Sequence, residues 1–201
     1  MAIQLKKGNS ISLKKEAPQL NKIMLGLGWD MAQEPARRSI FNIFKASTTI
    51  DLDSAVFCLN SNDALGSRND VVYYANLHHN SGAIHHQGDN LTGEGEGDDE
   101  QIMVELSKIP DNISSLLFTV NIYMGKDRRQ DFSNIKNAFV RLVDFNTNRE
   151  IAYYKLSESA FTNQTLMKMA ELRRTDNGWQ MKAIGEGSKN SLDELVKMYR
   201  N

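Results

Sequence analysis

Residues 164–184 read QTLMKMAELRRTDNGWQMKAI, and this stretch decides the fold class. Its first half, Gln164–Arg174, has helical propensity by composition alone. However, the turn Thr175-Asp176-Asn177-Gly178 follows it, and a second apolar run, Trp179–Ile184, comes directly afterwards. An Asn-Gly step before such a run is among the strongest short-range signals for a β-hairpin. We therefore predict two antiparallel strands here rather than a helix.

Outward from this hairpin, short apolar runs recur between Gly, Asn and Asp residues, mostly with the period of two that marks a strand. The predicted strands are Ile3–Leu5, Ile11–Leu13, Ile23–Trp29, Ile50–Leu59, Val71–Asn76, Ala83–His86, Gln101–Leu106, Ser115–Tyr123, Ala138–Phe145, Glu150–Leu156, Thr165–Arg174 and Trp179–Ile184. Such a series of short strands is typical of a sandwich. We expect an all-β protein, a two-sheet antiparallel β-sandwich that forms one domain over residues 1–201.

Two short helices are expected beside the strands. One is predicted near Asp131–Asn137. The other is a C-terminal helix from Ser191 to about Tyr199, because Glu194 stands three residues after Ser191, in the register of a capping box.

The segment Met31–Thr49 does not continue the pattern of short strands, and we interpret it as an inserted loop. It is basic and contains Phe41 and Phe44. These two rings could dock on a partner or on a membrane surface, or they could pack back onto the sandwich.

Composition excludes several classes of protein. Of the 201 residues, 24 are Lys or Arg and 25 are Asp or Glu, which gives a net charge of −1 and disfavours nucleic-acid binding through bulk charge. No apolar run is long enough for a signal peptide or a transmembrane segment. Cys58 is the only cysteine, so a disulfide framework is excluded and a cytoplasmic location is expected.

The acidic glycine-rich segment GDNLTGEGEGDDE, residues 88–100, is the most informative stretch for function. Its six carboxylates are Asp89, Glu94, Glu96, Asp98, Asp99 and Glu100, with no Lys or Arg among them. Its glycines allow the backbone to curl oxygen atoms toward one point, and Ca²⁺ prefers about six to eight oxygen ligands. The spacing does not fit an EF-hand. The alternative is an acidic loop that is merely solvated.

A second acidic group strengthens the prediction of a metal site. Asp51 and Asp53 lie two apart at the start of an apolar strand, so both carboxylates extend from the same face. Carboxylates at the start of a buried strand are costly unless they are paired or bind metal, although turn chemistry is the alternative. Asp30, directly after an earlier strand, could approach the same end.

Other candidate sites are weaker. The four histidines, His78, His79, His85 and His86, lie in one predicted hairpin and could bind a soft metal. Adjacent strand residues face opposite ways, however, so we expect ordinary surface histidines. The sequence contains no nucleophile or zinc-hydrolase motif, and we predict that the protein is not an enzyme.

At these residues the sequence resembles the TerD family of bacterial tellurite-resistance and stress proteins, most closely its TerZ-like branch. The matching segments are Gly26-Leu27-Gly28-Trp29-Asp30, Asp51-Leu52-Asp53-Ser54-Ala55, Gly88–Glu100, Arg128-Arg129-Gln130-x-Phe132, Asn137–Leu142 and Gly178-Trp179 with Ala183-Ile184-Gly185. The resemblance implies a calcium-binding β-sandwich and a cytoplasmic role in tellurite, phage and colicin resistance. It also implies partnership with other Ter-system proteins at the inner face of the membrane.

The resemblance further implies a set of metal ligands. They are Asp30, Asp51, Asp53, Asp89, Asn90, Thr92, Gly93, Glu94, Glu96, Asp98, Asp99 and Glu100. This set exceeds what one Ca²⁺ takes, so we expect two neighbouring ions that share carboxylates. We predict a non-enzymatic calcium-binding scaffold or interaction module. The alternative is a module that binds anionic lipid when calcium is present.

Overall fold

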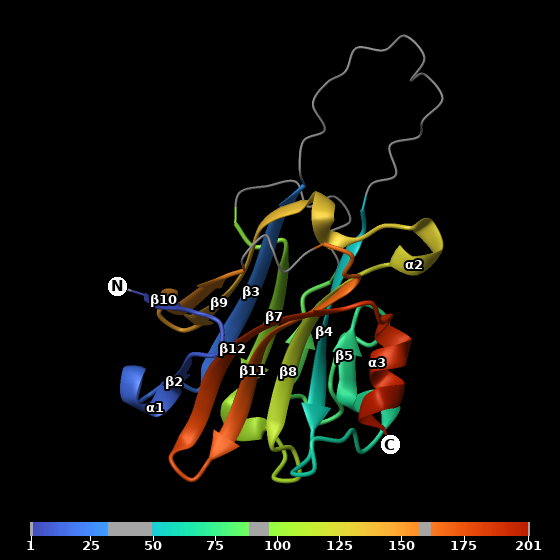
Figure 1. Ribbon diagram of the computed structural model, residues 1–201. Coiled ribbons are helices and arrows are strands. Elements are labelled where there is room, and N and C mark those ends of the chain that lie inside the picture. The colour runs from blue at the N-terminus through green and yellow to red at the C-terminus, as the bar shows by residue number, and fades with distance from the viewer. Residues whose placement is uncertain (1, 32–49, 89–96, 157–161, 201) are drawn as a thin grey trace, which may run out of the picture.

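The computed structural model describes residues 2–31, 50–88, 97–156 and 162–200. Within these residues, twelve strands form two six-stranded sheets that face each other (Figure 1). Sheet A has the order β1 (Ile3–Leu5), β10 (Arg149–Lys155), β9 (Ile135–Asp144), β3 (Lys22–Met31), β7 (Glu100–Glu105), β6 (Ile84–His86). Sheet B has the order β2 (Ser10–Ser12), β12 (Gly178–Ser188), β11 (Leu166–Thr175), β8 (Ser115–Ile122), β4 (Leu52–Leu59), β5 (Val71–Tyr73). The predicted all-β sandwich is confirmed. The parallel pair β1–β10 departs from the antiparallel pattern.

The C-terminal helix is also confirmed. Helix α3 covers Leu192–Tyr199, and its capping box is present: Ser191 Oγ accepts from Glu194 N, and Glu194 Oε2 accepts from Ser191 N. Two one-turn helices, α1 (Leu13–Glu16) and α2 (Gly125–Arg128), were not expected from the sequence. Short 3₁₀ turns cover Arg68–Asp70, Leu106–Lys108 and Phe132–Asn134.

The hairpin β11–β12 forms where the turn sequence predicts it. Thr175 pairs with Gly178, and Gly178 has a φ of 93°, which a residue with a side chain rarely adopts. The strand interpretation of Gln164–Arg174 is therefore right, because pairing with β8 and β12 outweighs the helical propensity of Met, Lys and Leu.

The predicted helix at Asp131–Asn137 is wrong. Asp131 Oδ1 accepts from Ser133 N, which caps a single 3₁₀ turn rather than a helix. Strand β9 then begins at Ile135 and pairs with the end of β3, where Met31 lies opposite Ile135. Asn137 has a φ of 51°, which would also interrupt a helix.

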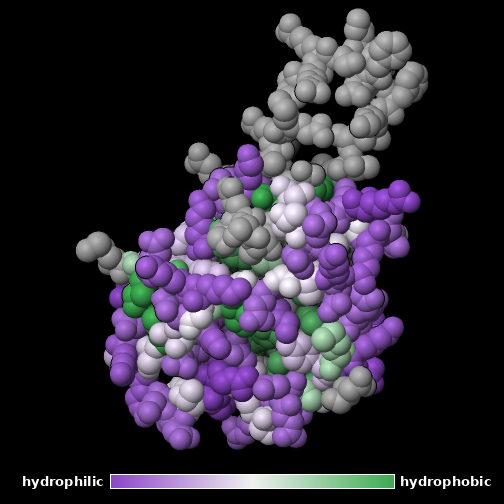
Figure 2. Space-filling model, in the orientation of Figure 1, coloured by the Kyte–Doolittle hydropathy of each residue, from purple (hydrophilic) through white to green (hydrophobic). Residues whose placement is uncertain are grey.

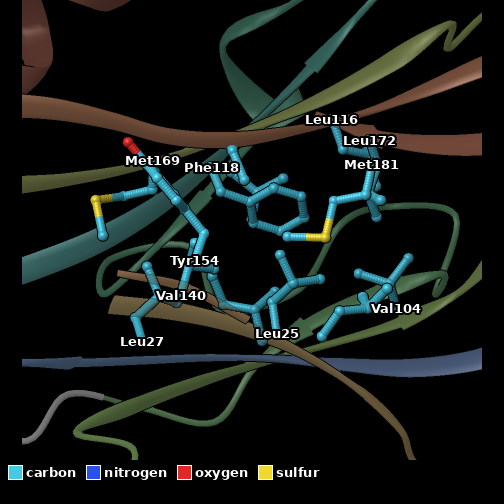
Figure 3. Close-up of a cluster of buried hydrophobic side chains, with 14 of the residues drawn as sticks. Leu25, Leu27, Val104, Leu116, Phe118, Val140, Tyr154, Met169, Leu172 and Met181 are labelled. Atoms are coloured by element: carbon cyan, nitrogen blue, oxygen red, sulfur yellow. The ribbon is translucent and has the colours of Figure 1, made fainter. Parts of the chain in front are cut away.

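The core lies between the two sheets and is made of the alternate residues of each strand (Figure 3). Leu25 and Leu27 of β3 face Phe118 of β8 and Met181 of β12. These side chains are at most 2% exposed. Tight packing of this layer fixes which residues of each strand point outward, and therefore which can reach a site.

Strands β4 and β8 are buried on both faces. Leu52 and Val56 point into the core between the sheets, whereas Ala55 and Phe57 pack under α3, where Phe57 contacts the ring of Tyr199. The face over β8, β11 and β12 is mostly hydrophilic (Figure 2). None of the described helices is long and apolar enough to cross a membrane.

Candidate metal centre

Three segments that carry predicted acidic ligands meet at one end of the sandwich. Strand β3 ends there, β4 and β7 begin there, and the pairing of Leu27 with Glu100 holds β3 against β7 (Figure 1). The amide of Asp99 extends this ladder by donating to the carbonyl of Leu27 at 2.8 Å. The short segment Asp98–Glu100 thereby lies beside the end of β3 that carries Asp30.

Glu100 joins the two sheets. Its side chain, on β7 of sheet A, is 1% exposed, and Oε2 accepts from the backbone N of Ser54 on β4 of sheet B at 2.7 Å. His86 Nε2 lies 3.3 Å from the same oxygen and 2.9 Å from Ser54 Oγ. The second oxygen, Oε1, is buried and has no hydrogen-bond partner in the described part of the chain. A buried carboxylate oxygen without a partner is costly, so a ligand is expected at it.

Ser54, His86 and Glu100 form a buried cluster of hydrogen bonds. His86 Nδ1 accepts from the amide of Gly88 at 3.1 Å, so a neutral ring carries its proton on Nε2. That nitrogen therefore donates to Ser54 and Glu100, and it cannot take a proton from Ser54 Oγ as a general base does. Ser54 is fully buried as well.

Asp98 anchors the end of the acidic segment. Arg141 on β9 donates to both of its carboxylate oxygens, from Nε at 2.6 Å and from the terminal nitrogen at 2.9 Å. Gln101, Gly26 and Arg141 are directly opposite one another on β7, β3 and β9. A Cβ on Gly26 would lie 2.2 Å from the Asp98 carboxyl group, so the glycine leaves the space that this carboxylate fills.

Asp99 is surrounded by like charge. Burial raises its pKa, and the charges of Asp30, Glu100 and Asp98 raise it further. The hydrogen bond from Trp29 N to Asp99 Oδ2, at 2.7 Å, opposes this shift without cancelling it. Three neighbouring carboxylates therefore repel the charge of Asp99, and a cation beside Asp99 would relieve that repulsion.

Asp30 is exposed and accepts from Asn137 Nδ2 at 2.6 Å. Lys155 donates to the other side of the same amide, at Asn137 Oδ1, so Asn137 links the carboxylate to a lysine. This arrangement keeps Asp30 beside the β3–β7 end without a direct ion pair to it within the described residues.

Asp53 lies on the other face of β4. It alternates with Ala55 and Phe57, which pack under α3, whereas Glu100 reaches β4 from the core side. Asp53 Oδ2 accepts from Asn121 Nδ2 at 3.4 Å, and both residues line a cavity of about 390 Å³. The pKa of Tyr74 in this cavity is raised by burial and by the charge of Asp53.

Asp51 comes just before the strand, and its Oδ1 is buried without a hydrogen-bond partner in the described residues.

A family model described as the TerD domain matches residues 1–199. The chain belongs to the TerD family. It is 39% identical over 200 residues to the Stress response protein SCP2 of Bacillus subtilis (strain 168), a match covering 99% of this chain and 100% of that protein. It is 35% identical over 199 residues to the Tellurium resistance protein TerD of Serratia marcescens, covering 99% and 97%, and 37% identical over 194 residues to the TerZ protein of the same organism, covering 96% and 94%.

The TerD fold is also seen in solved structures. A homologue of telluride resistance protein TerD from Streptomyces coelicolor A3(2) superposes with a TM-score of 0.64 at 18% identity, covering 88% of this chain and 95% of that one. At that identity the likeness concerns the fold. The predicted family and fold are thus both confirmed.

The predicted ligands of this TerD domain fall into three sets. Asp30, Asp98, Asp99 and Glu100 lie at the β3–β7 end, whereas Asp51 precedes β4 and Asp53 lies within it. The remaining predicted ligands lie outside the described residues: Asp89, Asn90, Thr92, Gly93, Glu94 and Glu96. Among the described residues, no three His, Cys, Asp or Glu side chains form a metal-binding group. The carboxylate oxygens at this end are of the donor type that a hard cation prefers.

Some residues of this region had no role in the sequence interpretation. Arg141 and Gly26 appeared only as parts of motifs, and their relation to Asp98 became visible through the strand register. The expectation of surface histidines was wrong for His79 and His86, which are 6% and 1% exposed. Burial of His86 could have been anticipated only with knowledge that Glu100 crosses between the sheets.

Proposed function

We propose that this chain is a calcium-binding, non-catalytic member of the TerD family, acting in tellurium resistance and the stress response as a scaffold or interaction module. The observation that carries the proposal is the position of Asp99 beside Asp30, Asp98 and Glu100: burial, and then the charges of these three carboxylates, raise the pKa of Asp99. In this role the chain would work in the cytoplasm with other Ter-system proteins, at the inner face of the membrane.

The donor set favours calcium over a softer metal. Every candidate atom is a carboxylate, amide or backbone oxygen, and two buried carboxylate oxygens, Glu100 Oε1 and Asp51 Oδ1, lack a hydrogen-bond partner in the described residues. Ca²⁺ accepts such mixed oxygen ligands in flexible geometry. Bound calcium would supply positive charge where the carboxylates repel one another.

Some of these residues position the acidic segment, and others would face the ion. Arg141 fixes Asp98, and Trp29 N fixes one oxygen of Asp99, so the segment before β7 is already positioned. Asp99, Asp30 and Glu100 Oε1 are then the oxygens that would face the ion. Because Glu100 also contacts β4, binding would tie the two sheets together at this end.

Calcium titration of chelator-stripped protein by calorimetry tests the proposal. We expect saturable binding of about two ions and a calcium-selective rise in melting temperature, with affinity reduced about tenfold or more in Asp99→Asn. Asp111→Asn, at a fully exposed carboxylate, is the matched control and should bind as the wild type does. Absence of binding at millimolar calcium would refute the proposal.

The same chelator-stripped protein can be tested for lipid binding by pelleting with vesicles. Pelleting with vesicles of anionic lipid only when calcium is present would favour the lipid-binding alternative. Phe41 and Phe44, the apolar residues expected to assist it, lie outside the described residues. Protein that stays in the supernatant while it binds calcium would support the scaffold.

A further inference from the structure

The outer face of sheet A carries a row of soft metal ligands at its β6 edge. On β6 and β7, His85 lies directly opposite Met103, and on β7 and β3, Met103 lies directly opposite Met24. A single bridge places His78 opposite His85 on the other side. Residues directly opposite each other in a sheet extend from the same face, with Cβ atoms about 4.5–5.5 Å apart. Two imidazoles and two thioethers therefore follow one another across four chain segments.

This row faces away from the core. Ile84 and Ile102, which flank it along the strands, are at most 1% exposed and pack between the sheets. His78 and His85 are exposed, while Met103 is half-buried. Met24 is buried at the inner end of the row. The site is thus open to an ion at the histidines and apolar behind them.

Two of the four histidine rings contact polar side chains, and the other two contact each other. His79 contacts Ser81 Oγ and Asp70, and His86 contacts Ser54 and Glu100. The rings of His78 and His85 instead contact each other, with centroids 4.0 Å apart, and neither makes a hydrogen bond to a described residue. Desolvation, followed by the charges of His78 and His86, lowers the pKa of His85, which favours the neutral ring that binds metal.

We infer that His78, His85 and Met103 form a binding site for Cu(I), with Met24 as a further thioether behind them. Imidazole suits several transition metals, but a thioether is a soft ligand that selects Cu(I) over Zn²⁺. Cys58, the chain's only thiol, is 1% exposed in the core and does not compete. The site shares no residue with the proposed calcium centre, so the experiments can refute either proposal without refuting the other.

Competition titration with Cu(I) held by bicinchoninate, under anaerobic reducing conditions and on the full chain, tests this inference. We expect one Cu(I) per chain, with affinity reduced roughly ten- to a hundredfold in His85→Gln and in Met103→Leu. Met198→Leu removes a thioether that is 59% exposed on α3, and it should leave the affinity unchanged. Melting curves of each variant check that it is folded.

Nuclear magnetic resonance provides a second readout, because Cu(I) is diamagnetic. The ring protons of two of the four histidines should shift on addition of one equivalent, and both shifts should be absent in His85→Gln. Shifts at His79 and His86 instead, or equal affinity in the variants and the wild type, would overturn the inference. Zn²⁺ binding that depends on His85 and not on Met103 would overturn the assignment to Cu(I).

Discussion

Gly26→Ala is the most direct test of how the acidic segment is anchored. The added Cβ would stand 2.2 Å from the carboxyl carbon of Asp98, far inside van der Waals contact. The carboxylate must then leave its position, and with it the two hydrogen bonds from Arg141 at 2.6 and 2.9 Å. Since Asp98 has a side-chain exposure of 0%, little solvent is present to replace them.

The expected cost follows from those two bonds. Hydrogen bonds to a charged group contribute about 1.5–3 kcal/mol each, but Arg141 is 31% exposed and recovers part of its loss by hydration. We therefore expect Gly26→Ala to lower the free energy of unfolding by about 2–3 kcal/mol. For a chain of this size each kcal/mol shifts the melting temperature by about 2–4 °C, so a fall of roughly 4–12 °C is expected.

A double-mutant cycle isolates the effect. In Asp98→Ala the space beside Gly26 is vacated, and adding Gly26→Ala should then change stability by less than about 1 kcal/mol, since alanine in a strand is otherwise the better residue. Chemical denaturation of the four proteins gives the coupling energy, expected at about 2–3 kcal/mol. Additive effects would refute the claim that Gly26 makes room for Asp98.

Three further predictions concern charge, capping and the thiol. Because burial and the neighbouring carboxylates raise the folded pKa of Asp99 above its ordinary value, the calcium-free protein should lose stability as pH rises from that ordinary value through the folded pKa. Asp99→Asn should therefore melt above the wild type at pH 7 in chelator and equal it near pH 3, whereas a lower melting temperature at pH 7 would contradict the pKa shift. Ser191→Ala removes the cap of α3 and should cost about 1 kcal/mol without altering calcium affinity, as measured by denaturation and calorimetry. Burial raises the pKa of Cys58, so a thiol reagent should label it only in denaturant. Rapid labelling of the native protein would show that the core opens there.

The strands were predictable because local rules agreed with the fold. Gly178 and the alternation around it specify the β11–β12 hairpin, and Ser191 with Glu194 specifies the start of α3. The helix expected at Asp131–Asn137 is limited to a 3₁₀ turn because Ile135 and Lys136 pair with the distant strand β3, which no local pattern records.

The site was predictable in its residue types and less so in its geometry. The excess of carboxylates before β7 indicated which residue types would lie there, and three of them raise the pKa of Asp99 in addition to its burial. Asp53 extends from the outer face of β4, whereas Glu100 contacts β4 from the core side. The sequence could not indicate this difference, because it depends on how the sheets stack. Arg141 and Asp98 are 43 residues apart, and no spacing rule connects them.

The order of strands has a consequence for synthesis of the chain. β1 pairs with β10 and β2 with β12, so these two early strands find their partners only after much more of the chain has been synthesised. Such non-local pairing makes folding slow, and it leaves incomplete chains with unpaired strand edges. Sheet B in particular cannot be completed until Gly178–Ser188 has emerged. Aggregation through unpaired strand edges is therefore expected mainly before Gly178–Ser188 has paired.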